Sequence, residues 1–120
     1  MNELKYIKTK NGGWFKMGNV FIDQYAKLIG PIGTSIYLCL KRHSNSKTRI
    51  AFPSEVLISE ELHINPRTVI RHLPILEKYG FIKITKTKSR GQWVSNQYYL
   101  THSKDWATKP SDLKSQGPYD

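Results

Sequence analysis

The sequence has only one cysteine, Cys39, and few acidic residues. A single cysteine excludes an internal disulfide framework and a cysteine-rich zinc site. No apolar run approaches the length of a membrane span or of a signal-peptide core. We therefore expect a cytoplasmic, soluble chain with no membrane partner. Its length of 120 residues is that of one domain.

The motifs of common enzyme classes are also missing. There is no Gly-rich phosphate loop, no Gly-x-Ser-x-Gly turn and no zinc signature. The four histidines have no metal-like spacing with Asp, Glu or Cys. Glu60-Glu61 reads as a surface pair on a helix, and Cys39 as a small buried hydrophobe. We predict no catalysis, no metal and no cofactor.

Positive charge is what the sequence has in excess. It contains 19 Lys and Arg against 9 Asp and Glu, a formal net charge of +10. A surface of this kind attracts polyanions, so nucleic acid is the first partner to consider and acidic lipid or protein the second. The 12% of aromatic residues indicates a folded core.

The chain divides into three parts by pattern. Residues 1–19 suggest an N-terminal arm or β-hairpin, with a turn at Asn11-Gly12-Gly13. Residues 20–101 carry the periodic helices and strands. Residues 102–120 are rich in Ser, Pro and Asp and predict a loosely ordered tail, in which Trp106 is the one plausible anchor.

The first helical region is expected in two pieces. A short helix over 22–28 is interrupted by Gly30-Pro31, and Pro31 suits the first turn of a new helix that ends near His43. A short strand over 49–52 follows. The buried face of the new helix is predicted from apolar residues at 3–4 spacing: Ile32, Ile36, Tyr37 and Leu40.

Two shorter helices come next. Ser54 is a natural N-cap for a helix that ends at Leu62, and His63-Ile64 forms a tight turn. Asn65-Pro66 starts the second helix, which Gly80 stops. Val69, Leu73 and Leu76 form its core face, with Pro74 expected to kink or shorten it.

A β-hairpin completes the order of elements. The stretches 81–87 and 93–101 alternate like strands, and Lys88-Ser89-Arg90-Gly91 forms the loop between them. No acidic residue occurs among residues 83–90.

The segment Pro53–Arg71, with Gly80-Phe81-Ile82 and Ser95-Asn96-Gln97-Tyr98, resembles the winged helix-turn-helix family of bacterial, plasmid and phage DNA-binding proteins. The resemblance implies an α+β fold, with a small helical core and a C-terminal β-hairpin wing. The sequence departs from the family pattern at His63, where the family usually has a turn glycine, at Pro66, which lacks an N–H, and at Pro74, which lies inside the second helix.

The resemblance also implies which residues meet DNA. The second helix would lie in the major groove, with a phosphate favoured at its N-terminus, and the wing would contact phosphates or the minor groove. The residues so implied come from the two helices and the wing: Ser54, Asn65, Arg67, Thr68, Arg71, His72, Lys78, Lys86, Lys88 and Arg90.

The function expected is that of a double-stranded DNA-binding protein, most simply a small transcriptional regulator. Two alternatives stay open at this point. One is a plasmid or phage replication-initiation or maintenance protein, and the other is a winged-helix module that binds an acidic protein. A homodimer is a further expectation, with the N-terminal hairpin or the Trp106 region as its contact.

Overall fold

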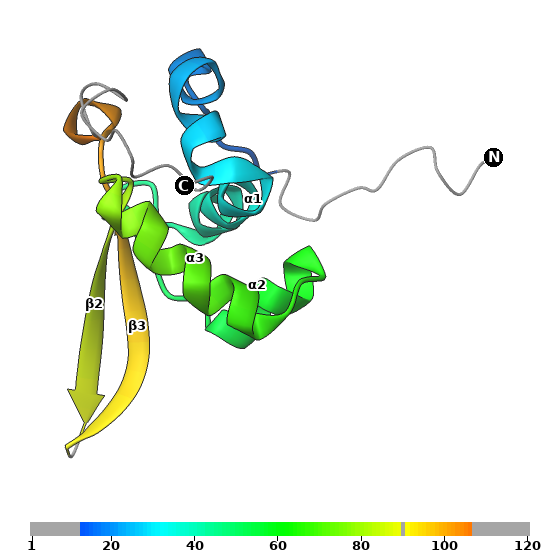
Figure 1. The fold of residues 1–120 in the computed structure, drawn as a ribbon. Coiled ribbons are helices and arrows are strands. Elements are labelled where there is room, and N and C mark those ends of the chain that lie inside the picture. The colour runs from blue at the N-terminus through cyan, green and yellow to red at the C-terminus, as the bar shows by residue number, and fades with distance from the viewer. Residues whose placement is uncertain (1–12, 90, 107–120) are drawn as a thin grey trace, which may run out of the picture.

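The computed structural model describes residues 13–89 and 91–106, which form helices packed against a small antiparallel sheet with a long protruding hairpin (Figure 1). The described elements are α1 (Ala26–His43), preceded by a π-helical turn (Phe21–Tyr25), then β1 (Ile50–Ala51), α2 (Glu55–Leu62), α3 (Pro66–Lys78), β2 (Ile82–Ser89), β3 (Gln92–Leu100) and a 3₁₀ turn (Ser103–Asp105). The sheet order is β1-β3-β2. The predicted α+β winged helix-turn-helix fold is confirmed.

The break expected at Gly30-Pro31 is present inside α1. Gly30 has φ 76° and ψ 174°, which is not a helical conformation, and Pro31 then starts the second part of the helix. Ile36, Tyr37 and Leu40 are buried as predicted, but Ile32 is 37% exposed. The predicted stripe is wrong at Ile32, because the buried side of α1 in this region is formed by Ile29 and Gly33, and Ile32 lies beside it.

The strand predicted over 49–52 is shorter than expected. Arg49 has φ 62°, a left-handed conformation, and only two residues pair with β3. The Arg49 guanidinium donates hydrogen bonds to the backbone oxygens of Leu100 (2.7 Å) and Thr101 (2.8 Å). Phe52 is 61% exposed. Arg49 is therefore a clamp on the end of β3 and not part of a strand.

Both caps of the helix-turn-helix are confirmed. The Ser54 hydroxyl accepts a hydrogen bond from the Leu57 N–H (3.0 Å), and the Asn65 side-chain oxygen accepts one from the Arg67 N–H (2.8 Å). Between the two helices His63 adopts the left-handed region with φ 57°. A helix ends readily at such a residue, and the reversal brings α3 back across α2.

Pro74 does not shorten α3. The helix continues for four residues beyond it to Lys78, in agreement with the predicted stop at Gly80; of the two effects expected of this proline, a kink or a shorter helix, the shortening does not occur. A proline removes one backbone hydrogen bond. Here Leu73 and Leu76, on either side of Pro74, are both buried, and their packing keeps the helical path.

Gly80 ends α3 as predicted, with φ 87°. Its N–H donates to the Glu77 backbone oxygen (3.0 Å), and the next N–H, of Phe81, donates to the Leu76 oxygen (3.0 Å). This pair of bonds is a Schellman motif, and it turns the chain directly from α3 into β2.

Phe81 leads from this turn into a cluster of buried aromatic rings. Its ring centroid lies 4.6 Å from Trp106, 5.5 Å from Tyr37, 5.6 Å from Tyr25 and 5.7 Å from Phe21. Trp106 is 6% exposed, which confirms it as an anchor. The predicted boundary after residue 101 is corrected accordingly, because residues up to Trp106 belong to the packed unit.

Parts of two predicted segments lie outside the described residues, namely most of the N-terminal arm (1–12) and the end of the tail (107–120). Within the described part of the chain, no helix is both long enough and apolar enough to cross a membrane.

The two left-handed residues at helix ends lead to a stability prediction. Replacing His63 by Gly removes the strain of a Cβ at φ 57°, so we expect the free energy of unfolding to rise by about 0.5–1 kcal/mol in urea titrations. The opposite change, Gly80→Ala, introduces a Cβ at φ 87°. It is expected to lower the free energy of unfolding by about 1–2 kcal/mol. A loss of stability in His63→Gly would contradict this explanation of the turn.

Candidate nucleic-acid interface

The two long sides of α3 differ sharply in exposure. Val69, Leu73 and Leu76 are at most 2% exposed and face the core, as predicted. Arg67 and Arg71 are both exposed, four residues apart and hence one turn apart on the same side. Burial of the apolar stripe therefore fixes where both guanidinium groups project.

Ile70 shares the exposed side, and it was missed from the sequence. It is 49% exposed, and its position three residues after Arg67 and one before Arg71 places it between them. An apolar side chain on such a surface is costly in water but suits contact with a thymine methyl group. The signal was available, since residue 70 falls outside the stripe that contains Val69, Leu73 and Leu76.

The N-terminus of α3 is not the phosphate site that was expected. Pro66 has no N–H, the Arg67 N–H is bound to the Asn65 side chain, and the Thr68 N–H donates to the Asn65 backbone oxygen (2.9 Å). Phosphate binding at a helix terminus needs free backbone N–H groups. The expectation is corrected, because the first turn has already used its donors.

The other residues predicted on the helices differ in exposure and in their hydrogen bonds. Ser54 and Asn65 are exposed, but their oxygens serve as the caps of α2 and α3. Thr68 is half-buried. His72 is also half-buried, and its Nδ1 lies 2.7 Å from the Thr68 backbone oxygen, so its ring lies against its own helix. Lys78 is exposed at the far end of α3.

The wing carries a basic strand. Lys83 and Lys86 are exposed on β2. A β-bulge between Thr87 and Lys88 interrupts the pairing with β3 close to the tip, and such bulges bend and twist a hairpin. The Lys88 side chain and the whole of Arg90 lie outside the described part of the structure.

Two contacts fix the base of the wing against the helices. The Glu77 carboxylate on α3 accepts a hydrogen bond from the Ile84 N–H on β2 (2.9 Å). On the other strand, the Asn96 amide donates to the Tyr98 hydroxyl (3.0 Å) and lies 3.4 Å from Glu55 Oε2 on α2. Burial also raises the pKa of Tyr98, which stays protonated in this contact. The wing and the helix-turn-helix are therefore held in one orientation.

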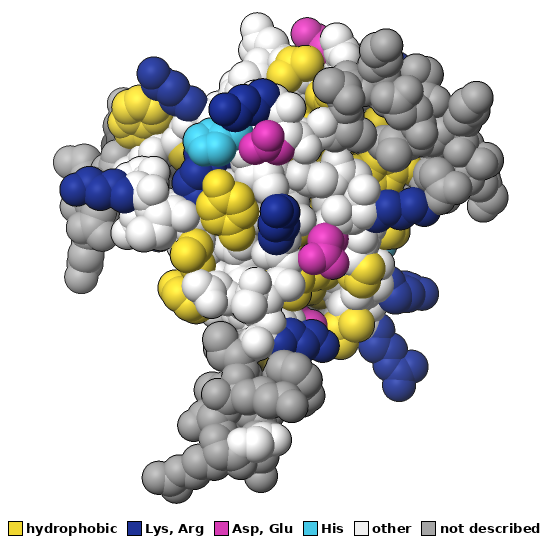
Figure 2. Space-filling model, turned by 90° about the vertical axis from the view of Figure 1, so that its left-hand side faces the viewer, with side chains coloured by type: hydrophobic (Ala, Val, Ile, Leu, Met, Phe, Trp, Pro, Cys, Tyr) yellow, Lys and Arg dark blue, Asp and Glu magenta, His cyan; other side chains and the backbone are white. Residues whose placement is uncertain are grey.

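The basic surface extends beyond α3. The face that lies at the left of Figure 1 carries many scattered Lys and Arg side chains, with apolar side chains exposed between them and few acidic groups (Figure 2). Not all of the positive charge is free to meet a ligand. Arg49 is used as a backbone clamp, and burial, together with the charge of Arg49, lowers the pKa of Lys41.

A separate cluster of Cys39, His43 and Glu61 lies between α1 and α2. Cys39 Sγ donates to Glu61 Oε1 (3.3 Å), and the same oxygen lies 2.7 Å from His43 Nε2. Burial and the bond to Glu61 raise the pKa of Cys39 to about 12, whereas the bond from His43 lowers the pKa of Glu61. The sequence showed no metal-like spacing for His43, whereas the structure places it beside Cys39, one helical turn away, and Glu61, on another helix.

Comparison with known families agrees with this geometry. Residues 30–82 match the family model described as a helix-turn-helix domain. The matched segment begins at the break in α1, includes α2, the turn at His63 and α3, and ends with the first residue of β2. This segment, a little under half of the chain, is therefore similar to a helix-turn-helix domain.

The similarity to a helix-turn-helix domain suggests DNA as the class of partner, and α3 lies where such domains have their groove-binding helix. The wing that follows it makes the fold a winged helix-turn-helix. No curated protein matches the chain significantly.

Proposed function

We propose that the chain is a sequence-specific double-stranded DNA-binding protein that inserts α3 into the major groove and acts as a small cytoplasmic transcriptional regulator. The observation that carries this proposal is the exposed side of α3, where Arg67, Ile70 and Arg71 project together while the opposite side is buried. It is a binding protein and not an enzyme.

The chemistry of these three side chains suits base recognition. An arginine can donate two hydrogen bonds to the O6 and N7 atoms of guanine, and an aliphatic side chain contacts the methyl group of thymine. Arg67 and Arg71 lie in the first two turns of α3, before Pro74. The preferred site is therefore expected to contain two guanines close to a thymine.

The wing supplies contacts of another kind. Lys86 is exposed on β2, and Lys88 and Arg90 follow it in the sequence. Lysine and arginine at a hairpin bind phosphates with little regard to sequence. The contacts of Glu77 and Asn96 hold the wing and α3 in one orientation, which supports binding of both to the same duplex.

Two other roles use the same fold. A replication or plasmid-maintenance protein would bind an origin instead of promoters, so mapping the bound sites in a genome separates it from a regulator. A protein-binding module would use the basic surface on an acidic partner. Duplex titrations at several salt concentrations separate this role from DNA binding, because only phosphate neutralisation gives a steep linear dependence of log K on log salt.

The first functional prediction concerns the arginines of α3. Changing Arg67 or Arg71 to Ala is expected to weaken a specific duplex by about 1–3 kcal/mol and to relax the preference at one guanine. The melting temperature of the protein should hardly change, because both side chains are exposed. Ile70→Ala is expected to relax the preference at a thymine instead. Selection from random duplexes followed by titration measures all three effects.

Lys27→Ala is the matched control for this experiment. Lys27 is an exposed cation on α1, outside α2, α3 and the wing, so its loss changes the net charge by the same amount. Full affinity and unchanged preference in both arginine variants would show that α3 is not the reading helix.

A second prediction concerns the wing. The double change Lys88→Ala with Arg90→Ala is expected to weaken specific and random duplexes by similar factors. It should also reduce the slope of log K against log salt by about one to two. Loss confined to the specific duplex, with the slope unchanged, would mean that the wing reads bases.

Pairing of two copies is a further part of the proposal. Two-fold dimers commonly read two half-sites and so gain specificity. Trp106 is buried in the core and is therefore not proposed as a contact between the two copies. Trp14 and Ile22, which are 76% and 64% exposed, are the candidates for this contact. Sedimentation at micromolar concentration, free and with a two-half-site duplex, is expected to show a dimer. A monomer in both conditions would rule out pairing.

A further inference from the structure

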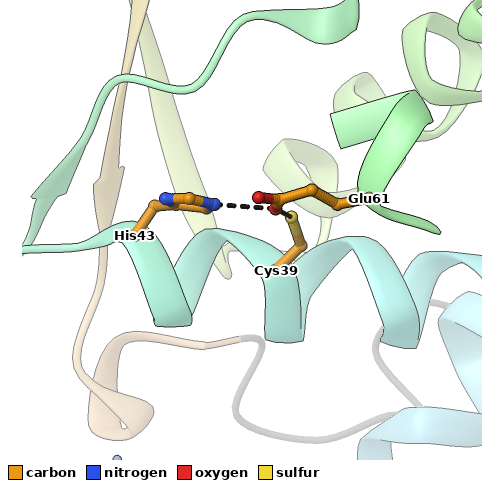
Figure 3. A group of neighbouring side chains, drawn as sticks. All are labelled: Cys39, His43 and Glu61. Atoms are coloured by element: carbon orange, nitrogen blue, oxygen red, sulfur yellow. Dashed lines mark hydrogen bonds and ion pairs between the residues drawn. The ribbon is translucent and has the colours of Figure 1, made fainter. Parts of the chain in front are cut away.

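We propose that Cys39, His43 and Glu61 form a binding site for a divalent transition-metal ion, with Zn²⁺ the best match, that joins α1 to the helix-turn-helix. The sulfur, imidazole nitrogen and carboxylate oxygen all lie within 4.8 Å of one another. Cys39 and His43 project from the same side of α1, and Glu61 reaches toward them from α2 (Figure 3).

The secondary structure brings these atoms together without a special loop. Cys39 and His43 are four residues apart in one continuous part of α1, so both side chains lie on the same side of the helix. Glu61 is in the last turn of α2, which packs against α1. Two ligands on one helix and a third on a neighbouring helix give a rigid base for a metal ion.

The ligand types and distances suit zinc. Zn²⁺ accepts thiolate, imidazole and carboxylate ligands at about 2.0–2.3 Å, which requires ligand atoms roughly 3.3–3.7 Å apart in a tetrahedron. Sγ and Oε1 are already 3.3 Å apart, and the 2.7 Å between Oε1 and Nε2 has to open slightly. The Glu61 side chain is 41% exposed and can make this adjustment.

Burial differs across the three ligands in a way that leaves a place for water. Cys39 is 7% exposed, whereas the side chains of His43 and Glu61 are 24% and 41% exposed. An ion held by three protein ligands keeps one tetrahedral position open, and here that position faces solvent. On binding, Zn²⁺ takes the place of the thiol proton, which passes to the solvent.

One neighbouring charge opposes the ion. Arg42 lies close enough to Cys39 and Glu61 for its positive charge to lower the pKa of both groups. The same charge repels a cation. The site is therefore expected to bind with moderate affinity, and to bind more tightly when this charge is removed.

The test is titration of the whole metal-free protein with Zn²⁺ alone, followed by calorimetry and thermal unfolding. We expect one ion per chain and a melting temperature that rises with Zn²⁺ concentration, because the ion binds the folded state. His43→Asn and Glu61→Gln are each expected to reduce the affinity by roughly tenfold or more, while Arg42→Gln increases it. The matched controls His102→Asn and Glu60→Gln change exposed residues outside the cluster and should bind as the wild type does.

Titration with Co²⁺ tests the sulfur ligand directly. A tetrahedral cobalt site with a thiolate has a sulfur-to-metal charge-transfer band in the near ultraviolet, and Cys39→Ala is expected to abolish this band. If that variant does not fold, the His43 and Glu61 variants still decide the matter, since both residues are partly exposed. The proposal is overturned if no stoichiometric binding is found, or if binding survives in both His43→Asn and Glu61→Gln.

Discussion

The packing of Phe81 is the interaction on which the positions of the other elements depend. Its ring is fully buried and contacts aromatic rings from the π-helical turn, α1 and the C-terminal turn. Its backbone N–H closes the Schellman motif at the end of α3, and β2 begins at the next residue. One residue thus fixes where α3 ends, where the wing starts and where the C-terminal turn is attached.

The exposed side of α3 is determined by which of its side chains the core buries. Because Val69, Leu73 and Leu76 are buried in the core, the helical period leaves Arg67, Ile70 and Arg71 exposed in the first two turns, together with Pro66. The wing is a two-stranded ribbon, which on its own is marginally stable. Pairing with β1 and the contacts of Glu77 and Asn96 give it a defined direction.

Local chemistry made much of this fold predictable. Ser54, Asn65 and Gly80 act on backbone groups within three or four residues, so their roles could be recognised from the sequence and are confirmed. Two of the features that the sequence did not predict involve distant partners. Arg49 bonds to residues about fifty positions away. The cluster of Cys39 and Glu61 likewise joins residues 22 positions apart, and no local pattern encodes either contact.

The turn at His63 connects the cluster of Cys39, His43 and Glu61 to α3. Glu61 lies in the last turn of α2, two residues before His63, and α3 begins three residues after it. A left-handed residue fixes one direction of the chain, so the angle between α2 and α3 depends on how firmly the end of α2 is held. The bonds of Glu61 to Cys39 and His43 hold that end against α1. The residues that anchor α2 therefore also determine how α3 is presented, although they lie outside its exposed side.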